Sequence, residues 1–191
     1  MNFCILPAGA WGTAMAIHLN RLGHTVTLLP RTQEEAFEMT THRENKQFFP
    51  GHHLDDSIQI GMEYKPALME AEVLILACPS KFLRSVCGEL RPFLTKENAR
   101  ALKLIIVLCK GLEPKTNELP LTALRQELPD IAGGLLSGPS FASQVALGQP
   151  TAMVFGNNLD AATSAQIFFF NDTAPTEIYT TDDVDGVGLG G

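Results

Sequence analysis

The stretch NFCILPAGAWG, residues 2–12, decides the fold of this chain. It opens with a near-continuous apolar run, which is typical of a parallel strand buried on both faces of a sheet. A glycine-containing turn follows directly. The residues from Trp11 to Leu22 then have helical periodicity and end at Gly23, a natural helix cap. The sequence therefore predicts a strand, a tight turn and a helix in immediate succession.

The same alternation continues along the chain. Further strand-like runs cover residues 25–29, 73–77, 104–108, 135–136, 151–155 and 178–180. Helix-like stretches cover residues 33–42, 80–90, 141–147 and 159–168. This order predicts an α/β fold, a Rossmann-like, doubly wound, mostly parallel sheet with right-handed crossovers and helices on both faces.

We find no internal repeat or linker, so residues 1–191 are interpreted as one domain. Residues 168–178 fit neither period well. They resemble translated adaptor sequence, so a corrupted stretch is one interpretation, and no function is assigned to them.

Composition excludes several function classes. Hydrophobic residues make up 45% of the 191 residues and charged residues 18%, as in ordinary globular proteins. The 14 Lys and Arg against 21 Asp and Glu give a net charge of −7, which argues against a nucleic-acid or anionic-membrane binder. A few local cations could still hold an anionic small molecule.

No signal peptide or membrane span is expected. The 4 cysteines form no C-x-x-C pair and are interpreted as buried hydrophobic residues in a reducing compartment, so a cytoplasmic location is expected.

The turn after the first strand resembles the dinucleotide fingerprint G-x-G-x-x-G. Gly9 takes the second glycine position, where a missing side chain lets a pyrophosphate approach the backbone, and Gly12 takes the third, where helix and strand pack closely. Ala10 and Trp11 lie between them, at a helix N-terminus whose N–H groups favour phosphate. Pro7 replaces the first glycine, so either the turn takes a different shape or the residue is a sequence error. A plain glycine turn is the alternative. We predict that residues 9–12 bind a dinucleotide.

Arg31 follows the second strand, where NAD-selective domains usually place an acid that binds the ribose 2′-hydroxyl. An arginine can instead accept the 2′-phosphate of NADP. The position predicts NADP or NAD as cofactor, with NADP favoured. A solvated loop arginine is the alternative.

Four further segments resemble loops of the NAD(P)-dependent glycerol-3-phosphate dehydrogenase family of bacterial type, in the expected order. Together with Trp11 in the turn, they make a specific set. They are NKQFFPG (residues 45–51), ACPS (77–80), CKGLEP (109–114) and LSGPSFA (136–142).

The resemblance implies reversible hydride transfer between NAD(P)H and dihydroxyacetone phosphate, supplying glycerol 3-phosphate for phospholipid synthesis. It implies that Lys110 contacts cofactor and substrate, that Gly138 and Ser140 contact the phosphorylated substrate, and that Ala142 contacts the cofactor. The alternatives are a solvated Lys110 and a Gly-Pro-Ser turn in which Ser140 caps the next helix.

The last residues, 179–191, resemble a family segment that continues "A-L-K-N". The resemblance therefore places the catalytic lysine just past Gly191, followed by a helical substrate domain. We expect no catalytic residue within residues 1–191 and negligible reduction of dihydroxyacetone phosphate by them alone. The full-length enzyme could be a homodimer.

Other function classes stay open. One is a related Rossmann dehydrogenase acting on hydroxy acids or ketopantoate, and another is a nucleotide-binding sensor module without catalysis. His52 and His53, with His42 before them and two aspartates after, match no standard zinc spacing, so no metal site is expected.

One geometric prediction follows from the topology. Ligands of open α/β sheets bind outside the carboxyl ends of the strands. Residues far apart in sequence should therefore converge on one rim of the sheet, namely Gly9, Trp11, Arg31, Lys110 and Ser140.

Overall fold

The computed structural model describes residues 1–157, 166–170 and 178–180. The strands of its large sheet are β1 (Asn2–Leu6), β2 (Thr25–Leu28), β5 (Gln59–Ile60), β6 (Val73–Leu76), β7 (Leu104–Val107), β8 (Gly133–Ser137), β9 (Thr151–Asn157), β10 (Gln166–Phe170) and β11 (Ile178–Thr180). A separate antiparallel hairpin consists of β3 (Glu44–Asn45) and β4 (Phe49–His53). The α-helices are α1 (Ala10–Arg21), α2 (Gln33–His42), α3 (Tyr64–Met69), α4 (Leu83–Leu90), α5 (Pro120–Glu127) and α6 (Ala142–Ala146).

The sheet is doubly wound, as the sequence predicts. Its strand order is β11-β10-β9-β8-β7-β6-β1-β2-β5, and the strands from β8 to β5 are parallel. In this parallel part the chain winds outward from β1 to β5, returns to β6 and winds outward again to β8. The point where the winding reverses lies between β1 and β6, and ligands of such sheets bind outside the carboxyl ends of the strands there.

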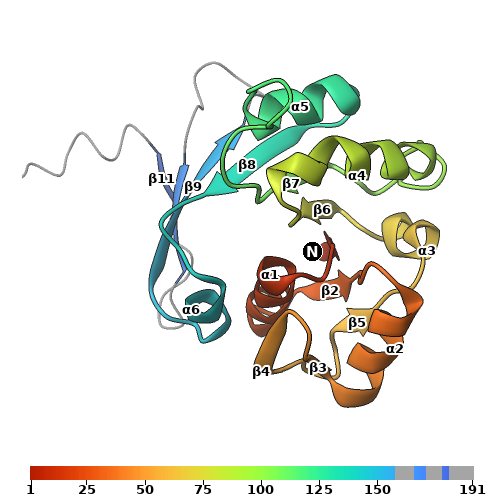
Figure 1. The fold of residues 1–191 in the computed structure, drawn as a ribbon, viewed down its shortest axis with the longest axis vertical. Coiled ribbons are helices and arrows are strands. Elements are labelled where there is room, and N and C mark those ends of the chain that lie inside the picture. The colour runs from red at the N-terminus through yellow and green to blue at the C-terminus, as the bar shows by residue number, and fades with distance from the viewer. Residues whose placement is uncertain (158–165, 171–177, 181–191) are drawn as a thin grey trace, which may run out of the picture.

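Helices cover both faces of the parallel strands (Figure 1). Strand β6 shows why its sequence is apolar throughout, because alternate side chains enter different cores. Val73 and Ile75 join the core beneath α1 and α6, and Leu74 and Leu76 join the core beneath α3, α4 and α5. Burying one such side chain stabilises the fold by about 1.5–3 kcal/mol.

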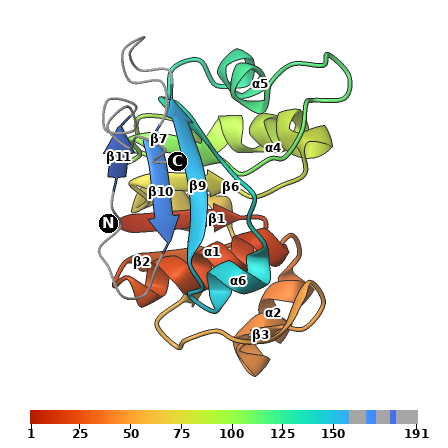
Figure 2. The same ribbon diagram turned by 90° about the vertical axis from the view of Figure 1, so that its left-hand side faces the viewer.

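The last strands extend the sheet in antiparallel fashion. Strand β9 pairs with β8 from Ser137↔Val154 to Gly134↔Asn157, and β10 and β11 follow it. In Figure 2, β9 and β10 run across the direction of β1 and β2, so this end of the sheet is strongly twisted.

Helix α1 ends as its sequence predicts. Gly23 has a φ of +81°, a left-handed conformation that favours glycine. Its N–H donates to Asn20 O (2.9 Å), and the N–H of His24 donates to Leu19 O (3.1 Å). These two bonds form a Schellman motif, which returns the chain into β2.

Several elements differ from the sequence predictions. Residues 80–90 form a 3-10 turn, Ser80–Phe82, followed by α4, instead of one helix. The hairpin, β5, α3 and α5 are not predicted, since short elements give weak periodic signals. Most of the helix predicted at 159–168 lies outside the described residues, and its last part, residues 166–168, belongs to β10. That part of the prediction is wrong, because pairing with β9 overrides the local pattern.

The doubtful stretch 168–178 is described only at its two ends, residues 168–170 in β10 and residue 178 in β11. None of the helices among the described residues has the length and apolar composition that a membrane span requires.

Candidate functional site

The Gly-rich turn (residues 7–12) joins β1 to α1 and is fixed by backbone hydrogen bonds. The N–H of Ala8 donates to Leu29 O (2.9 Å), and the N–H of Gly9 donates to Pro7 O (2.8 Å). A Cβ on Gly12 would lie 2.3 Å from Pro7 O and 3.4 Å from Ala77 Cβ. Only glycine fits at position 12, so close packing of helix and strand is retained although Pro7 replaces the first fingerprint glycine.

Gly9 has the opposite surroundings. It precedes α1 in an extended conformation, and a Cβ built on it meets no heavy atom within 4 Å. Helix α1 has no side-chain cap and no acidic residue in its first turn. The backbone N–H groups of Ala10, Trp11 and Gly12, together with the partial positive charge of the helix N-terminus, can therefore serve an anion. The space beside Gly9 is open for one.

A groove of about 480 Å³ opens beside this turn, at the point where the winding of the sheet reverses. Arg31 and Phe48 line it beyond the end of β2, and the 3-10 turn after β6 and helix α4 line it opposite. The lining residues are Leu6, Pro7, Gly9, Leu29, Pro30, Arg31, Phe48, Tyr64, Ala77, Cys78, Pro79, Phe82, Ser85, Val86 and Glu89. A largely apolar cleft with few polar groups suits a flat aromatic base.

Arg31 is half-exposed at the edge of this groove, with 54% of its side chain accessible. Its guanidinium lies over the Phe48 ring, 4.4 Å from the centroid. Its Nη2 donates to Glu35 Oε1 (2.7 Å), and its backbone N–H donates to Glu35 Oε2 (3.0 Å). Glu35 and Phe48 therefore hold the Arg31 guanidinium, while about half of its side chain is in contact with solvent.

Asn45 pins the Gly-rich turn from outside the sheet. Its side chain is buried, and Nδ2 donates to Ala8 O (2.7 Å) and to Thr13 Oγ1 (2.8 Å). Its Oδ1 accepts from the N–H of Phe48 (3.1 Å), which places that ring beneath Arg31. Residues 45–51 belong to the segments that resemble the family, but that resemblance by itself assigns Asn45 no role. Asn45 is the first residue of this segment, and its hydrogen bonds show that it holds the Gly-rich turn in place.

Lys110 joins the carboxyl end of β7 to the Gly-rich turn. Its Nζ lies 4.9 Å from the centroid of the Trp11 ring and donates to Ser140 O (3.0 Å). A cation over an indole face is favourable. The predicted convergence is confirmed: Gly9 and Arg31 line one groove, and Lys110, Trp11 and Ser140 meet beside it. The ammonium group is thus held at the rim of the sheet.

The segment from Gly138 to Ala142 has structural duties of its own. A Cβ on Gly138 would lie 2.7 Å from Ala152 O, so β9 requires glycine there. Ser140 is buried but does not cap α6, whose N-cap is Phe141 without a side-chain bond, so that alternative is wrong. Ala142 packs beside Ala10 against a small core cluster, which brings the start of α6 to the start of α1.

The lysine loop (residues 110–118) is held by charged groups. Glu113 is buried, and its Oε2 accepts from the N–H of Thr116 (2.9 Å) and from Thr116 Oγ1 (2.8 Å). Arg84 of α4 reaches it at 3.7 Å, and also pairs with Glu118 (2.6 Å) and Glu127 (3.1 Å). The hydrogen bond from Thr116, and then the nearby Arg84 charge, hold the pKa of Glu113 below its ordinary value of 4.5.

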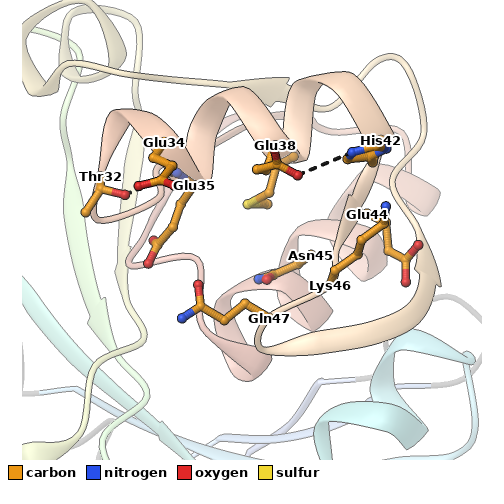
Figure 3. Close-up of a pocket in the computed structure, with 10 residues that line it drawn as sticks. Thr32, Glu34, Glu35, Glu38, His42, Glu44, Asn45, Lys46 and Gln47 are labelled. Carbon is orange, nitrogen blue, oxygen red and sulfur yellow. Dashed lines mark hydrogen bonds and ion pairs between the residues drawn. The ribbon is translucent and has the colours of Figure 1, made fainter.

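A second cavity, of about 440 Å³, lies between α2 and residues 44–47 (Figure 3). Glu34, Glu35 and Glu38 line it from the helix, and Lys46 and Gln47 line it from the loop after β3. Glu38 pairs with His42 at 3.3 Å. Among the described residues, no group of three His, Cys, Asp or Glu side chains is placed to hold a metal ion.

All four cysteines are buried thiols in the core beneath α3, α4 and α5. Burial raises the pKa of Cys4 and of Cys87 to about 12, so both are neutral at pH 7. Cys78 and Cys109 follow neighbouring strands, and the Cys109 thiol donates to Cys78 O (3.0 Å). The interpretation of the cysteines as buried hydrophobic residues is confirmed.

Comparison with known proteins identifies relatives of this arrangement. A family model described as NAD-dependent glycerol-3-phosphate dehydrogenase N-terminus matches residues 2–163. The glycerol-3-phosphate dehydrogenase [NAD(P)+] of Dechloromonas aromatica is 37% identical over 193 residues, covering 100% of this chain and 56% of that protein. The chain thus spans little more than half the length of this curated relative.

Solved structures agree with this likeness. The glycerol-3-phosphate dehydrogenase of Coxiella burnetii has a TM-score of 0.73 and 27% identity, covering 82% of this chain and 46% of that one. A ketopantoate reductase from Ralstonia eutropha has a TM-score of 0.53 and 21% identity, covering 71% of this chain and 41% of that one. The second likeness is one of fold alone.

Proposed function

Because this chain belongs to the family of NAD-dependent glycerol-3-phosphate dehydrogenases, we propose that it is the nucleotide-binding part of an enzyme that interconverts dihydroxyacetone phosphate and sn-glycerol 3-phosphate. In the cell such a reaction supplies glycerol 3-phosphate for phospholipids. The bound cofactor, NAD or NADP, supplies or accepts the hydride. The residues of this chain bind the cofactor, orient it toward the substrate and polarise the substrate carbonyl.

One observation carries the proposal: the Lys110 ammonium lies beside the Gly-rich turn, held between the Trp11 ring (4.9 Å) and Ser140 O (3.0 Å). A groove that suits a nucleotide and a cation that suits an anionic reactant therefore lie side by side at the carboxyl edge of the sheet. A cation in that place stabilises negative charge that develops on a carbonyl oxygen during reduction.

The residues present fit a dinucleotide. The space beside Gly9 admits a pyrophosphate to the backbone, and the uncapped start of α1 offers it N–H donors. The groove between Arg31 and Phe82 suits the adenosine half. Lys110 and Ala142, close to the start of α1, are proposed to contact the cofactor, and Lys110, Gly138 and Ser140 the substrate. A preference for NADP, based on Arg31, stays a prediction.

Nucleotide titration and turnover test the proposal together. Trp11, the chain's single tryptophan, lies in the site, so its fluorescence should change on addition of NADH or NADPH. In the full-length protein, dihydroxyacetone phosphate should drive oxidation of the reduced cofactor, followed by absorbance. Lys110→Ala should lower kcat/KM by about 100-fold or more, as expected for loss of an electrostatic stabiliser. Lys115→Ala, an exposed change in the same loop, is the control.

Each outcome separates the candidate functions. Nucleotide binding without turnover in the full-length protein would favour the sensor module over the enzyme. Turnover with a 2-hydroxy acid or with ketopantoate, and none with dihydroxyacetone phosphate, would favour a related dehydrogenase. Full activity in Lys110→Ala would contradict the role given to Lys110.

The remaining expectations are proposals as well. The four buried free thiols agree with a reducing compartment, which supports a cytoplasmic location. The further lysine expected beyond Gly191, the negligible activity of residues 1–191 alone, the homodimer and the lack of nucleic-acid binding stay predictions.

A further inference from the structure

We propose that Glu35 sets the preference between the two dinucleotides, because it holds Arg31 and opposes a phosphate on the ribose 2′-oxygen. The inference rests on the proposed function and deepens it. No acid follows β2 directly, but Glu35 in the first turn of α2 contacts Arg31 there.

Two contacts place the Glu35 carboxylate at the end of β2. Oε2 accepts the backbone N–H of Arg31 at 3.0 Å, and Oε1 accepts Nη2 of the same residue at 2.7 Å. The Glu35 side chain is only 16% exposed, whereas that of Arg31 is 54% exposed. The carboxylate is therefore more buried than the guanidinium. Glu35 lines the cavity beside α2, whereas Arg31 lines the groove, next to the position where Rossmann domains bind the ribose 2′-oxygen.

The guanidinium is held from two directions. The Phe48 ring supports its plane at 4.4 Å, and Glu35 engages its Nη2 end. A guanidinium has five N–H donors in a fixed fork, so it can still reach a second acceptor. The 2′-phosphate of NADPH would then bind an arginine that is already paired with Glu35, and not an unpaired cation.

Charge makes this sharing selective. The Arg31–Glu35 pair is close to neutral, so a phosphate at this place meets no net positive charge. A phosphate monoester carries about −1.5 to −2 charges at pH 7. NADH has a hydroxyl in its place. The repulsion from Glu35 therefore falls on NADPH and leaves NADH almost unaffected.

Glu35 also has a local duty, which the test must leave intact. Its N–H donates to Oγ1 of Thr32, the N-cap of α2 (3.1 Å), and its carboxylate accepts the N–H of Arg31, one residue before the N-cap. Glu35→Gln keeps an amide oxygen that can accept the same N–H. It removes the charge and, because the other terminal atom becomes an NH2 donor, also the acceptor for Arg31 Nη2. An effect on nucleotide preference then reports the electrostatic role and not the helix cap.

The experiment compares dissociation constants for NADH and NADPH, measured by Trp11 fluorescence, in wild type, Glu35→Gln and Glu38→Gln. Glu38 lies one turn farther along α2, pairs with His42 and is 58% exposed, so its variant matches the change in net charge. Glu35→Gln should raise the preference for NADPH by about three- to tenfold, or about 0.7 to 1.4 kcal/mol. NADH affinity should change less than twofold, and Glu38→Gln should leave the ratio within twofold.

The double variant Arg31→Ala/Glu35→Gln sharpens the result. If Glu35 acts through Arg31, the gain in NADPH preference should vanish when Arg31 is absent. An unchanged ratio in Glu35→Gln, or an equal rise in Glu38→Gln, would overturn the inference while nucleotide binding remained. A wild type that binds neither nucleotide would contradict the proposed function itself. A thermal melt of each variant checks that the fold is kept.

Discussion

The Gly-rich turn and the lysine loop lie at the same edge of the sheet, but different interactions hold them. Backbone hydrogen bonds and one buried amide, Asn45, fix the turn. The lysine loop depends on ionised groups, with Glu113 inside it and Arg84 joining it to two further carboxylates. The first arrangement contains no titrating group, whereas the second requires carboxylates to stay charged.

The Gly-rich turn and the lysine loop serve different tasks in the site. A pyrophosphate needs donors at fixed positions, and a turn without titrating groups keeps them in place at any moderate pH. Lys110 starts a loop whose own anchors are charges, so its position can respond to pH and salt. The two halves of the site should therefore fail under different conditions.

The largest expected effect comes from Gly12. Gly12→Ala places a Cβ 2.3 Å from Pro7 O, so the turn and α1 must move apart. We expect a loss of about 2–3 kcal/mol in the free energy of unfolding, as for overpacked core sites. Denaturant titration measures it.

Gly9 and Gly88 supply the matched controls. A Cβ at either position meets no heavy atom within 4 Å. Gly9→Ala should leave stability within about 1 kcal/mol of wild type but weaken nucleotide binding, and Gly88→Ala, within α4, should stabilise by about 0.5–1 kcal/mol. Equal stability of the Gly12 and Gly9 variants would contradict the close approach of helix and strand.

A smaller effect is expected from Asn45. Asn45→Ala removes the donor to Ala8 O and the acceptor of the Phe48 N–H, leaving buried backbone groups without their partners. The cost should be about 1–3 kcal/mol. Asn20→Ala, whose amide bonds Ser57 Oγ at the surface (2.8 Å), should cost less than about 1 kcal/mol. If the two variants unfold alike, Asn45 does not pin the turn.

The smallest effect is a pH dependence in the lysine loop. Because the folded pKa of Glu113 lies below 4.5, its stabilising contribution is present above that value. It is lost as the pH falls through the lowered pKa. Thermal melts of wild type and Glu113→Gln should therefore differ most near pH 7 and converge on acidification. Glu63→Gln, at an exposed site, controls for net charge. Parallel curves for wild type and Glu113→Gln would exclude this role.

Much of the fold could be predicted from sequence, because buried parallel strands and amphipathic helices have local periods. The apolar run of β6 and the glycine that ends α1 are examples, and both are confirmed. The short hairpin of β3 and β4 could not be found in this way. The hairpin is tied to the rest of the fold by the hydrogen bond from Asn45 to Ala8 O, and Ala8 lies 37 positions earlier in the chain.

The candidate site divides in the same manner. The sequence by itself determined that a glycine turn follows β1, that Arg31 follows β2 and that Lys110 follows β7, since these are matters of order along the chain. Only the tertiary structure decided that Lys110 lies over Trp11 and that Glu35 of α2 holds Arg31. The physical reason is that strand order brings distant loops to one edge, and side-chain charge and shape then select partners there.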